Sequence, residues 1–169
     1  AGPMLSEALE QKGVSFSFLE GQRITSPEVR DVAQSIFTQT NKQLVEALES
    51  YGANAVGLTS DIFKCKKTKP ELGLVGDIEQ VNLQSINQVL ESGAIPVIAP
   101  IGKDSNEILN VNADIATVEL VKAMNPYKVI FLSETGGIFN QSAQLIETIN
   151  LVLEYEDLMQ QDWLHSGMK

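Results

Sequence analysis

The chain has 169 residues, of which 43% are hydrophobic and 20% charged, an ordinary composition for one medium α/β domain or two small lobes. Its net charge of -10, from 12 basic and 22 acidic residues, argues against nucleic-acid binding. Cys65 and His165 are single, so no disulfide framework, multi-cysteine zinc site or Ser-His-Asp triad is expected, and a reducing compartment is favoured. No apolar run reaches the roughly 20 residues that span a bilayer, so no membrane association is expected.

The first third of the chain predicts two helical regions around one short strand. Apolar spacing at 5, 8 and 9 predicts one face of a helix that Gly13 ends, and alternating apolar residues predict a strand from Val14 to Phe18. Ser26-Pro27-Glu28 is typical of a helix start, with a capping hydroxyl, a proline and a first-turn acid. The polar run 39–41 leaves open whether one helix or two follow.

The middle of the chain alternates strands and helices. Strands are predicted over 55–58, 72–78 and 95–98, and a helix capped by Asn82 is predicted to end at Gly93. The lysine-rich segment 64–69 is interpreted as a solvated loop or hairpin. After Ile98, Pro100 and Gly102 are expected to end the strand and begin a polar loop.

The stretch from Ile95 to Asp114 is the most informative part of the sequence. Asn110, Asn112 and Asp114 recur at period two, which places them on one face of an extended segment, and Asp114 is expected to cap the next helix. Polar groups between a strand end and a helix start are typical of ligand sites in open α/β sheets. The alternative is a loop whose Asn and Asp side chains only satisfy the backbone.

The last part of the chain predicts a helix over 115–124 closed by Asn125-Pro126, a buried strand over 129–132, a hairpin over 138–146 and a short acidic helix near the end. Alternating helices and strands predict an α/β fold, a mainly parallel sheet covered on both faces.

Two further features suggest ligand contacts. Arg23 follows a turn just before a helix start, where its guanidinium could clamp a carboxylate, although a surface arginine is the simpler alternative. The loop 133–137 directly follows a predicted strand and could close over a nucleotide, although its glycine pair also fits a plain turn.

Seven motifs run through the chain in one order. They are Gly2-Pro3, 21–25 (GQRIT), 41–45 (NKQLV), 72–78 (LGLVGDI) with Val81-Asn82, 95–102, 110–114 (NVNAD) and 131–138. In these motifs the chain resembles the amino-acid kinase family, and within it the acetylglutamate branch. The C-terminal run 155–163 is most similar to fungal kinases and bacterial bifunctional synthase/kinases.

The resemblance implies a three-layer αβα sandwich with an open, mainly parallel sheet, in which residues 1–125 bind N-acetyl-L-glutamate and 126–169 begin the ATP-binding lobe. It implies transfer of the ATP γ-phosphoryl group to the substrate's side-chain carboxylate in arginine biosynthesis, with Mg²⁺ bound alongside the nucleotide. Arg23 would grip the α-carboxylate and Asp114 would organise catalytic lysines. Further substrate contacts are implied for Ala1, Gly2, Asn110 and Asn112, and nucleotide contacts for Ser133, Glu134, Thr135, Gly136 and Gly137.

The chain departs from the family pattern at both catalytic lysines. It begins inside the second glycine loop, and Lys169 does not align with the invariant lysine. These 169 residues alone are therefore expected to have low kinase activity, since lost charge contacts to a transition state typically cost several kcal/mol each.

The alternative function is a regulatory amino-acid kinase domain of an N-acetylglutamate synthase, without kinase activity, or a module that binds acetylglutamate without turnover. The resemblance further implies a homo-oligomer, a fused or partner acetyltransferase domain, and either bacterial cytoplasm or fungal mitochondrial matrix. Sensitivity to arginine as an effector is left open.

Overall fold

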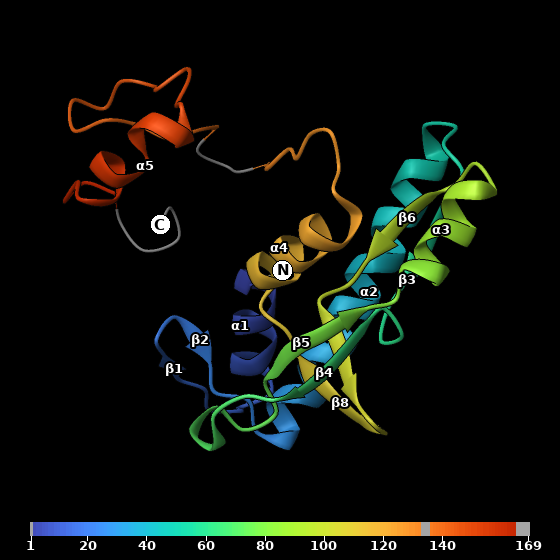
Figure 1. The fold of residues 1–169 in the computed structure, drawn as a ribbon. Coiled ribbons are helices and arrows are strands. Elements are labelled where there is room, and N and C mark those ends of the chain that lie inside the picture. The colour runs from blue at the N-terminus through green and yellow to red at the C-terminus, as the bar shows by residue number, and fades with distance from the viewer. Residues whose placement is uncertain (1, 133–135, 165–169) are drawn as a thin grey trace. The chain divides into compact units, whose positions relative to one another are not determined.

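The computed structural model describes residues 2–132 and 136–164. The chain divides into two compact units, Ala1–Pro126 and Tyr127–Lys169, and each is described by itself. Figure 1 shows the course of the chain and the labels used below.

The first unit begins with a helix and a small hairpin, followed by a long helix and two larger groups of strands. Strand β3 pairs in parallel with β6. A four-stranded sheet has the order β5-β4-β7-β8, in which β4 and β7 are parallel and the other pairs antiparallel. The elements are α1 (Gly2–Gln11), β1 (Phe18–Leu19), β2 (Gln22–Arg23), α2 (Pro27–Ser50), β3 (Ala55–Leu58), β4 (Phe63–Lys67), the 3₁₀ turn η1 (Pro70–Leu72), β5 (Gly76–Val81), α3 (Leu83–Glu91), β6 (Ile95–Ile98), β7 (Ile101–Asp104), β8 (Glu107–Asn110) and α4 (Ala113–Met124).

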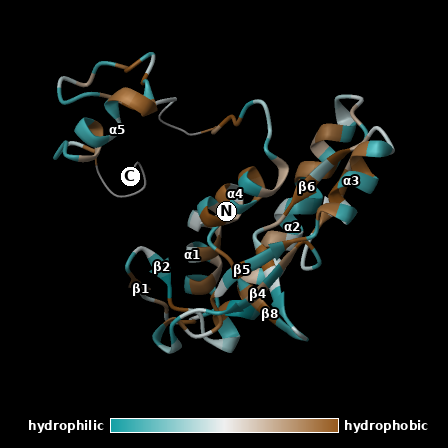
Figure 2. Ribbon diagram, viewed as in Figure 1, coloured by the Kyte–Doolittle hydropathy of each residue, from teal (hydrophilic) through white to brown (hydrophobic). Residues whose placement is uncertain are grey.

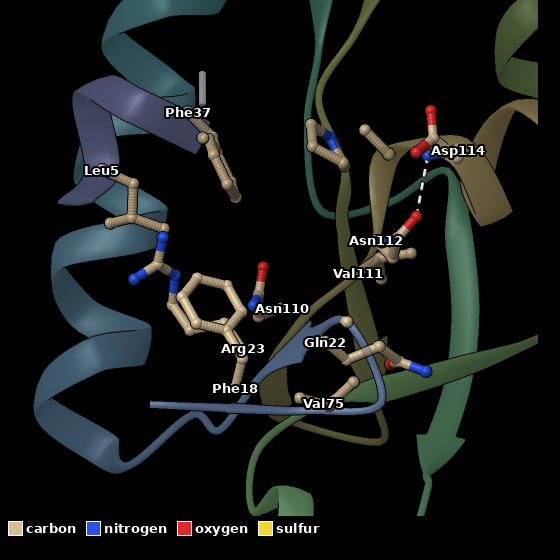
Figure 3. A pocket seen from close by; sticks show the side chains of 14 residues that line it. Leu5, Phe18, Gln22, Arg23, Phe37, Val75, Asn110, Val111, Asn112 and Asp114 are labelled. Carbon is tan, nitrogen blue, oxygen red and sulfur yellow. Dashed lines mark hydrogen bonds between the residues drawn. The ribbon is translucent and has the colours of Figure 1, made fainter. Parts of the chain in front are cut away.

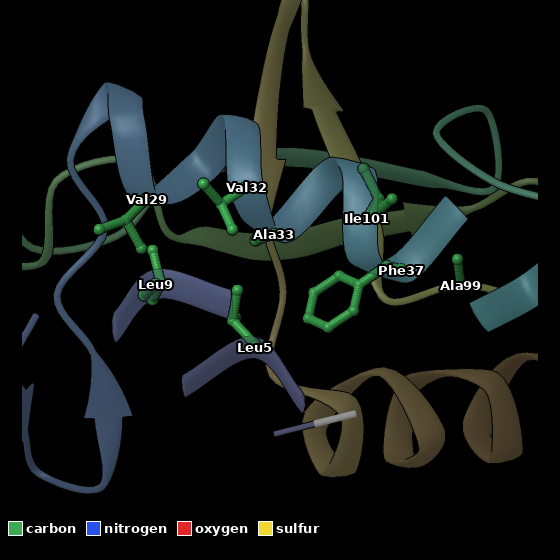
Figure 4. Packing of buried hydrophobic residues seen from close by; sticks show 8 residues of the cluster. All are labelled: Leu5, Leu9, Val29, Val32, Ala33, Phe37, Ala99 and Ile101. Atoms are coloured by element: carbon green, nitrogen blue, oxygen red, sulfur yellow. The ribbon is translucent and has the colours of Figure 1, made fainter. Parts of the chain in front are cut away.

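Two hydrophobic clusters cover opposite faces of the strands. On one face α1 and α2 pack with Ala99, Ile101 and Ile108, as Figure 4 shows for the buried members of this cluster. On the other face Leu109 and Val111 join residues of α3 and α4. Neighbouring residues Ile108 and Leu109 therefore serve opposite cores, as strand alternation requires, and the first unit has helices on both faces of its strands. In Figure 2 the helices carry alternating hydrophobic and hydrophilic stripes, the pattern of amphipathic helices at a core.

The α/β class is confirmed, as are the helix capped by Asn82 and the closure of α4 at Asn125, whose φ is 46°. The described sheets contain more antiparallel pairing than a mainly parallel sheet predicts, because β4-β5 and β7-β8 are hairpin neighbours. The prediction of a polar loop after Ile98 is wrong, because strands β7 and β8 occupy this part of the chain. The strand expected over 72–78 begins only at Gly76.

The lysine-rich segment forms a hairpin strand rather than a loop. In β4, Phe63 and Cys65 are buried while Lys64 and Lys66 are exposed, so the segment alternates with period two. β4 pairs with β5 in antiparallel fashion, so the hairpin interpretation of this segment is confirmed. The lysines of β4 lie on the solvent-exposed face of the hairpin.

The polar run 39–41 does not divide the second helix, because α2 is continuous from Pro27 to Ser50. Asn41 is buried, and its Nδ2 donates to the carbonyl oxygen of Val97 at 2.7 Å. The amide is thus satisfied inside the core and has no reason to end the helix. At the start of α2, Ser26 accepts a hydrogen bond from Val29 N, as predicted.

The second unit contains a short hairpin and α5 (Leu151–Met159). The predicted hairpin is found, with a bridge between Phe139 and Leu145 and a hydrogen bond from Ile146 N to Ile138 O. The buried strand predicted over 129–132 is wrong, because these residues are exposed and pair with no described strand. A strand needs a neighbour for its backbone hydrogen bonds, and the described residues supply none here.

Candidate functional site

Arg23 and Asn110, which are 87 positions apart in sequence, line the same cavity in the first unit. The cavity has a volume of about 220 Å³, and Figure 3 shows its lining. Residues from α1, the β1-β2 hairpin, the end of β8 and the start of α4 converge on it. Its volume lies below the roughly 300–1,000 Å³ of pockets for drug-sized ligands, so it suits a small metabolite.

The β1-β2 hairpin presents Arg23 to the cavity. Glu20 and Gly21 have φ values of 51° and 76°, the left-handed conformations of a type I′ two-residue turn. This tight turn returns the chain so that Phe18 pairs with Arg23 across the hairpin. The predicted strand from Val14 is wrong for residues 14–17, where Phe16 contributes to an aromatic wall instead of a ladder.

The Arg23 guanidinium is held by two aromatic rings and one hydroxyl. Its central carbon lies 4.3 Å from the Phe16 ring centroid and 4.7 Å from that of Phe18. One terminal nitrogen, Nη2, donates to Ser6 Oγ at 2.8 Å. Cation–π contact and this hydrogen bond fix the plane of the guanidinium.

The other terminal nitrogen of Arg23, Nη1, is buried and has no hydrogen-bond partner among the described residues. No carboxylate of the described residues forms an ion pair with Arg23, which is 9% exposed. Burial lowers the pKa of Arg23, although a guanidinium stays protonated. A buried cation with an unused donor is costly by itself, and an anionic ligand would offset that cost.

Asn110 ends β8 and is tied to the chain near Arg23 through Thr25. Asn110 Nδ2 donates to Thr25 Oγ1 at 3.1 Å, and Thr25 Oγ1 donates to Arg23 O at 2.9 Å. Asn110 thereby sits at the cavity with one amide edge already used. The arrangement offers a guanidinium and a carboxamide to one ligand.

The helix cap is Asn112, so the expectation that Asp114 caps α4 is wrong. Asn112 Oδ1 accepts hydrogen bonds from Asp114 N at 2.9 Å and Ile115 N at 3.1 Å, while Asp114 is exposed in the first helical turn. The cap lies two residues earlier than predicted because Asn112 has extended backbone and its side chain reaches two N–H groups. Both residues still line the cavity.

The remaining predicted site residues are divided between the units. Gly2 lines the cavity as the first residue of α1, not as part of a loop, and Ala1 lies outside the described residues. Ser133, Glu134 and Thr135 also lie outside them. Gly136, with φ 75°, and Gly137 belong to the second unit.

Sequence reasoning missed Ser6, Phe16, Phe18 and Thr25 as parts of the site. Phe16 and Phe18 could have been suspected as an aromatic pair close to Arg23, because arginine stacks readily on aromatic faces. Ser6 carried no sequence signal, since only the packing of α1 brings it to the hairpin.

Within residues 2–132 and 136–164, Arg23 and Asp114 are the only charged residues that line the cavity, and no lysine does. Among the described residues, no group of three His, Cys, Asp or Glu side chains could hold a metal ion. None of the described helices combines the length and apolarity needed to cross a membrane.

Comparison with known proteins identifies relatives over the whole chain. The acetylglutamate kinase of Xylella fastidiosa (strain 9a5c) is 44% identical over 171 residues, which cover 100% of this chain and 41% of that protein. The mitochondrial protein arg-6 of Neurospora crassa is 42% identical over 100% of this chain and 20% of its own length. The chain thus spans about two fifths or less of these curated relatives.

A solved structure shares the fold at low identity. N-acetylglutamate synthase from Neisseria gonorrhoeae, complexed with coenzyme A and L-arginine, superposes with a TM-score of 0.81 at 16% identity, over 96% of this chain and 41% of that one. The model of the amino acid kinase family matches residues 1–169. The chain therefore belongs to the amino acid kinase family.

Proposed function

We propose that this chain is part of an acetylglutamate kinase. In this proposal the first unit binds N-acetyl-L-glutamate, and the enzyme transfers the γ-phosphoryl group of ATP to the side-chain carboxylate, in arginine biosynthesis. The identity of 44% to a bacterial acetylglutamate kinase over the whole chain supports this reaction rather than another of the family.

One observation carries the proposal: Arg23 lines a metabolite-sized cavity, and its buried Nη1 has no hydrogen-bond partner among the described residues. A carboxylate is the complementary ligand, because it accepts charge-assisted hydrogen bonds from guanidinium nitrogens. Asn110, at the same cavity, supplies a neutral polar contact for a second group of the ligand. We assign the α-carboxylate to Arg23, with Gly2 and Asn112 as further wall residues.

The nucleotide would bind to the second unit and its continuation. Residues 126–169 are proposed to begin the ATP-binding lobe, with 133–137 contacting the nucleotide. Mg²⁺ would be held chiefly by ATP phosphates, in keeping with its usual coordination. The bound nucleotide and metal supply the phosphoryl group and part of its charge neutralisation.

The first unit contributes positioning to this reaction. A bond forms between the substrate carboxylate oxygen and the γ-phosphorus while the bond to the β,γ-bridging oxygen breaks and ADP leaves. Phosphoryl transfer depends on alignment and charge neutralisation more than on a covalent side chain. Because no lysine of the described residues lines the cavity, we expect residues 1–169 alone to bind the substrate but to phosphorylate it poorly. Asp114 is proposed to orient cationic groups of the complete site.

Calorimetric titration with N-acetyl-L-glutamate tests the proposal, with Arg23→Met as the binding-deficient variant. Arg30→Met is the matched control, because Arg30 is a half-buried arginine that bonds Asp31 and Ile108 O outside the cavity. We expect the wild-type and Arg30→Met chains to bind and Arg23→Met to lose binding. Equal binding by all three would refute the site.

A regulatory domain of a synthase predicts a different outcome. Such a domain would bind L-arginine and would neither bind ATP nor form acyl phosphate, which hydroxamate trapping detects. A module that only binds the substrate would take up acetylglutamate but release no ADP. The proposal also includes homo-oligomerisation and a fused or partner acetyltransferase domain. According to source, it places the protein in the mitochondrial matrix or in the bacterial cytoplasm. Light scattering tests the oligomer.

A further inference from the structure

Thr25 is a fully buried hydroxyl that joins the two principal residues of the cavity. Its exposure is 0%, and its Oγ1 lies 2.9 Å from Arg23 O and 3.1 Å from Asn110 Nδ2. It does not itself line the cavity. Its position between Arg23 and Asn110 therefore suggests an effect on how these residues meet a ligand.

The hydrogen-bond inventory fixes the direction of this chain of contacts. A threonine hydroxyl has one proton, and a backbone carbonyl can only accept, so the proton of Thr25 goes to Arg23 O. Only lone pairs of Oγ1 then remain for Asn110, which must present its NH₂ group to Thr25. The Asn110 carbonyl oxygen is left on the opposite edge of the carboxamide, and Figure 3 shows it pointing away from the nitrogen.

Backbone hydrogen bonds hold Thr25 in this place. Thr25 N donates to Leu72 O at 2.9 Å, and Leu74 N donates to Thr25 O at 2.8 Å. Asn110 N in turn donates to Leu74 O at 2.9 Å. The segment 72–74 therefore fixes the backbone positions of both Thr25 and Asn110. A flip of the Asn110 carboxamide would bring its carbonyl oxygen against a hydroxyl with no proton to give, in a buried setting where that is costly.

We propose that Thr25 is a positioning residue that makes Asn110 a hydrogen-bond acceptor toward the cavity. The cavity then combines a cation at Arg23 with an acceptor at Asn110, which selects a ligand that carries an N–H donor beside its carboxylate. This inference rests on the proposed function for the choice of ligand, because the amide of N-acetyl-L-glutamate is such a donor.

The test compares N-acetyl-L-glutamate with 2-acetoxyglutarate, in which an ester oxygen replaces the amide N–H. Calorimetry on the full chain measures the ratio of the two Kd values. The wild-type chain should favour the amide by about tenfold, the order expected for one hydrogen bond to a partly buried group. Thr25→Val, which keeps the shape but removes the hydroxyl, should abolish this preference, and Thr25→Ser should keep it. Thr68→Val, which removes a hydroxyl bonded to the backbone oxygen of the cavity residue Val75 and not to the Asn110 side chain, should also keep it.

A second measurement needs no ligand. The side-chain NH₂ of Asn110 should exchange slowly with solvent in the wild-type, Thr25→Ser and Thr68→Val chains, and rapidly in Thr25→Val, as NMR can follow. The inference is overturned if Thr25→Val keeps the amide preference or the slow exchange, or if Thr25→Ser loses them as fully as Thr25→Val. If neither ligand binds but the exchange pattern holds, the proposed function fails while the orienting role of Thr25 stands.

Discussion

Replacing Arg23 by methionine should separate ligand binding from folding. Arg23 is 9% exposed and contacts two aromatic rings and Ser6 Oγ, and it forms no ion pair with a carboxylate of the described residues. Two cation–π contacts contribute about 0.5–2 kcal/mol each, and a hydrogen bond from a charged group about 1.5–3 kcal/mol. Desolvation of the cation costs several kcal/mol and offsets these contributions.

Methionine keeps much of the apolar contact with Phe16 and Phe18 and carries no charge to desolvate. We therefore expect the free energy of unfolding without ligand to stay the same or to rise by up to about 2 kcal/mol. Binding should behave in the opposite way. Loss of one partner of a buried charged contact costs about 2–5 kcal/mol, which raises Kd roughly 30-fold to several thousand-fold.

Thermal unfolding with and without N-acetyl-L-glutamate measures both effects. At a ligand concentration about 100 times Kd, binding adds about 2.7 kcal/mol, which corresponds to an increase in Tm of about 5–10 °C for a chain of this size. At the same concentration the variant, with Kd raised at least about 30-fold, should gain about 3 °C or less. The reasoning is refuted if Arg23→Met keeps the ligand-induced increase, or if it unfolds the ligand-free chain.

Three further predictions concern stability. Gly73→Ala should lower the unfolding free energy by about 2 kcal/mol or more in urea titrations, because φ is 69° and the added Cβ would collide with Thr25 O. The control Gly13→Ala, with φ 66° and open space around it, should lower the unfolding free energy by only about 1 kcal/mol. Equal losses in the two variants would contradict the role of the collision. Asn112→Ala should cost about 1 kcal/mol through loss of the α4 cap while Asn112→Asp is tolerated, and an unchanged urea midpoint in Asn112→Ala would count against the cap. Burial, together with the charges of Asp77 and Glu79, raises the pKa of Cys65 to about 11. As the pH rises, the thiol of the unfolded chain therefore ionises before that of the folded chain, near pH 8.5. The unfolding free energy should fall between about pH 9 and 11 by about 1 kcal/mol per pH unit, and Cys65→Ala should lack this slope.

The sequence by itself determined the parts of the fold that depend on local signals. The start of α2 at Ser26-Pro27, the Asn82 cap and the end of α4 at Asn125 follow from backbone chemistry within a few residues. The apolar run of β6 was equally clear. The motifs also indicated the family, which the match over residues 1–169 confirms.

Packing between distant segments decided what local signals could not. The polar run that includes Asn41 suggested a helix break, but the amide of Asn41 donates a hydrogen bond to the carbonyl of Val97 inside the core. The lysines of β4 suggested a loop or hairpin, and pairing with β5 makes the segment a strand of a hairpin. The predicted strand over 129–132 lacks a described neighbour, and no local pattern reports that. Strand partners are chosen by tertiary context, so propensity alone cannot supply them.

The candidate site shows the same division. Arg23 and Asn110 could be selected from the sequence because their residue types suit an acidic ligand, but their meeting in one cavity is a result of the fold. Ser6, Thr25 and the two phenylalanines were found only in the structure. A hydrogen bond between residues 85 positions apart, such as that from Asn110 to Thr25, depends on distances that chain order does not contain.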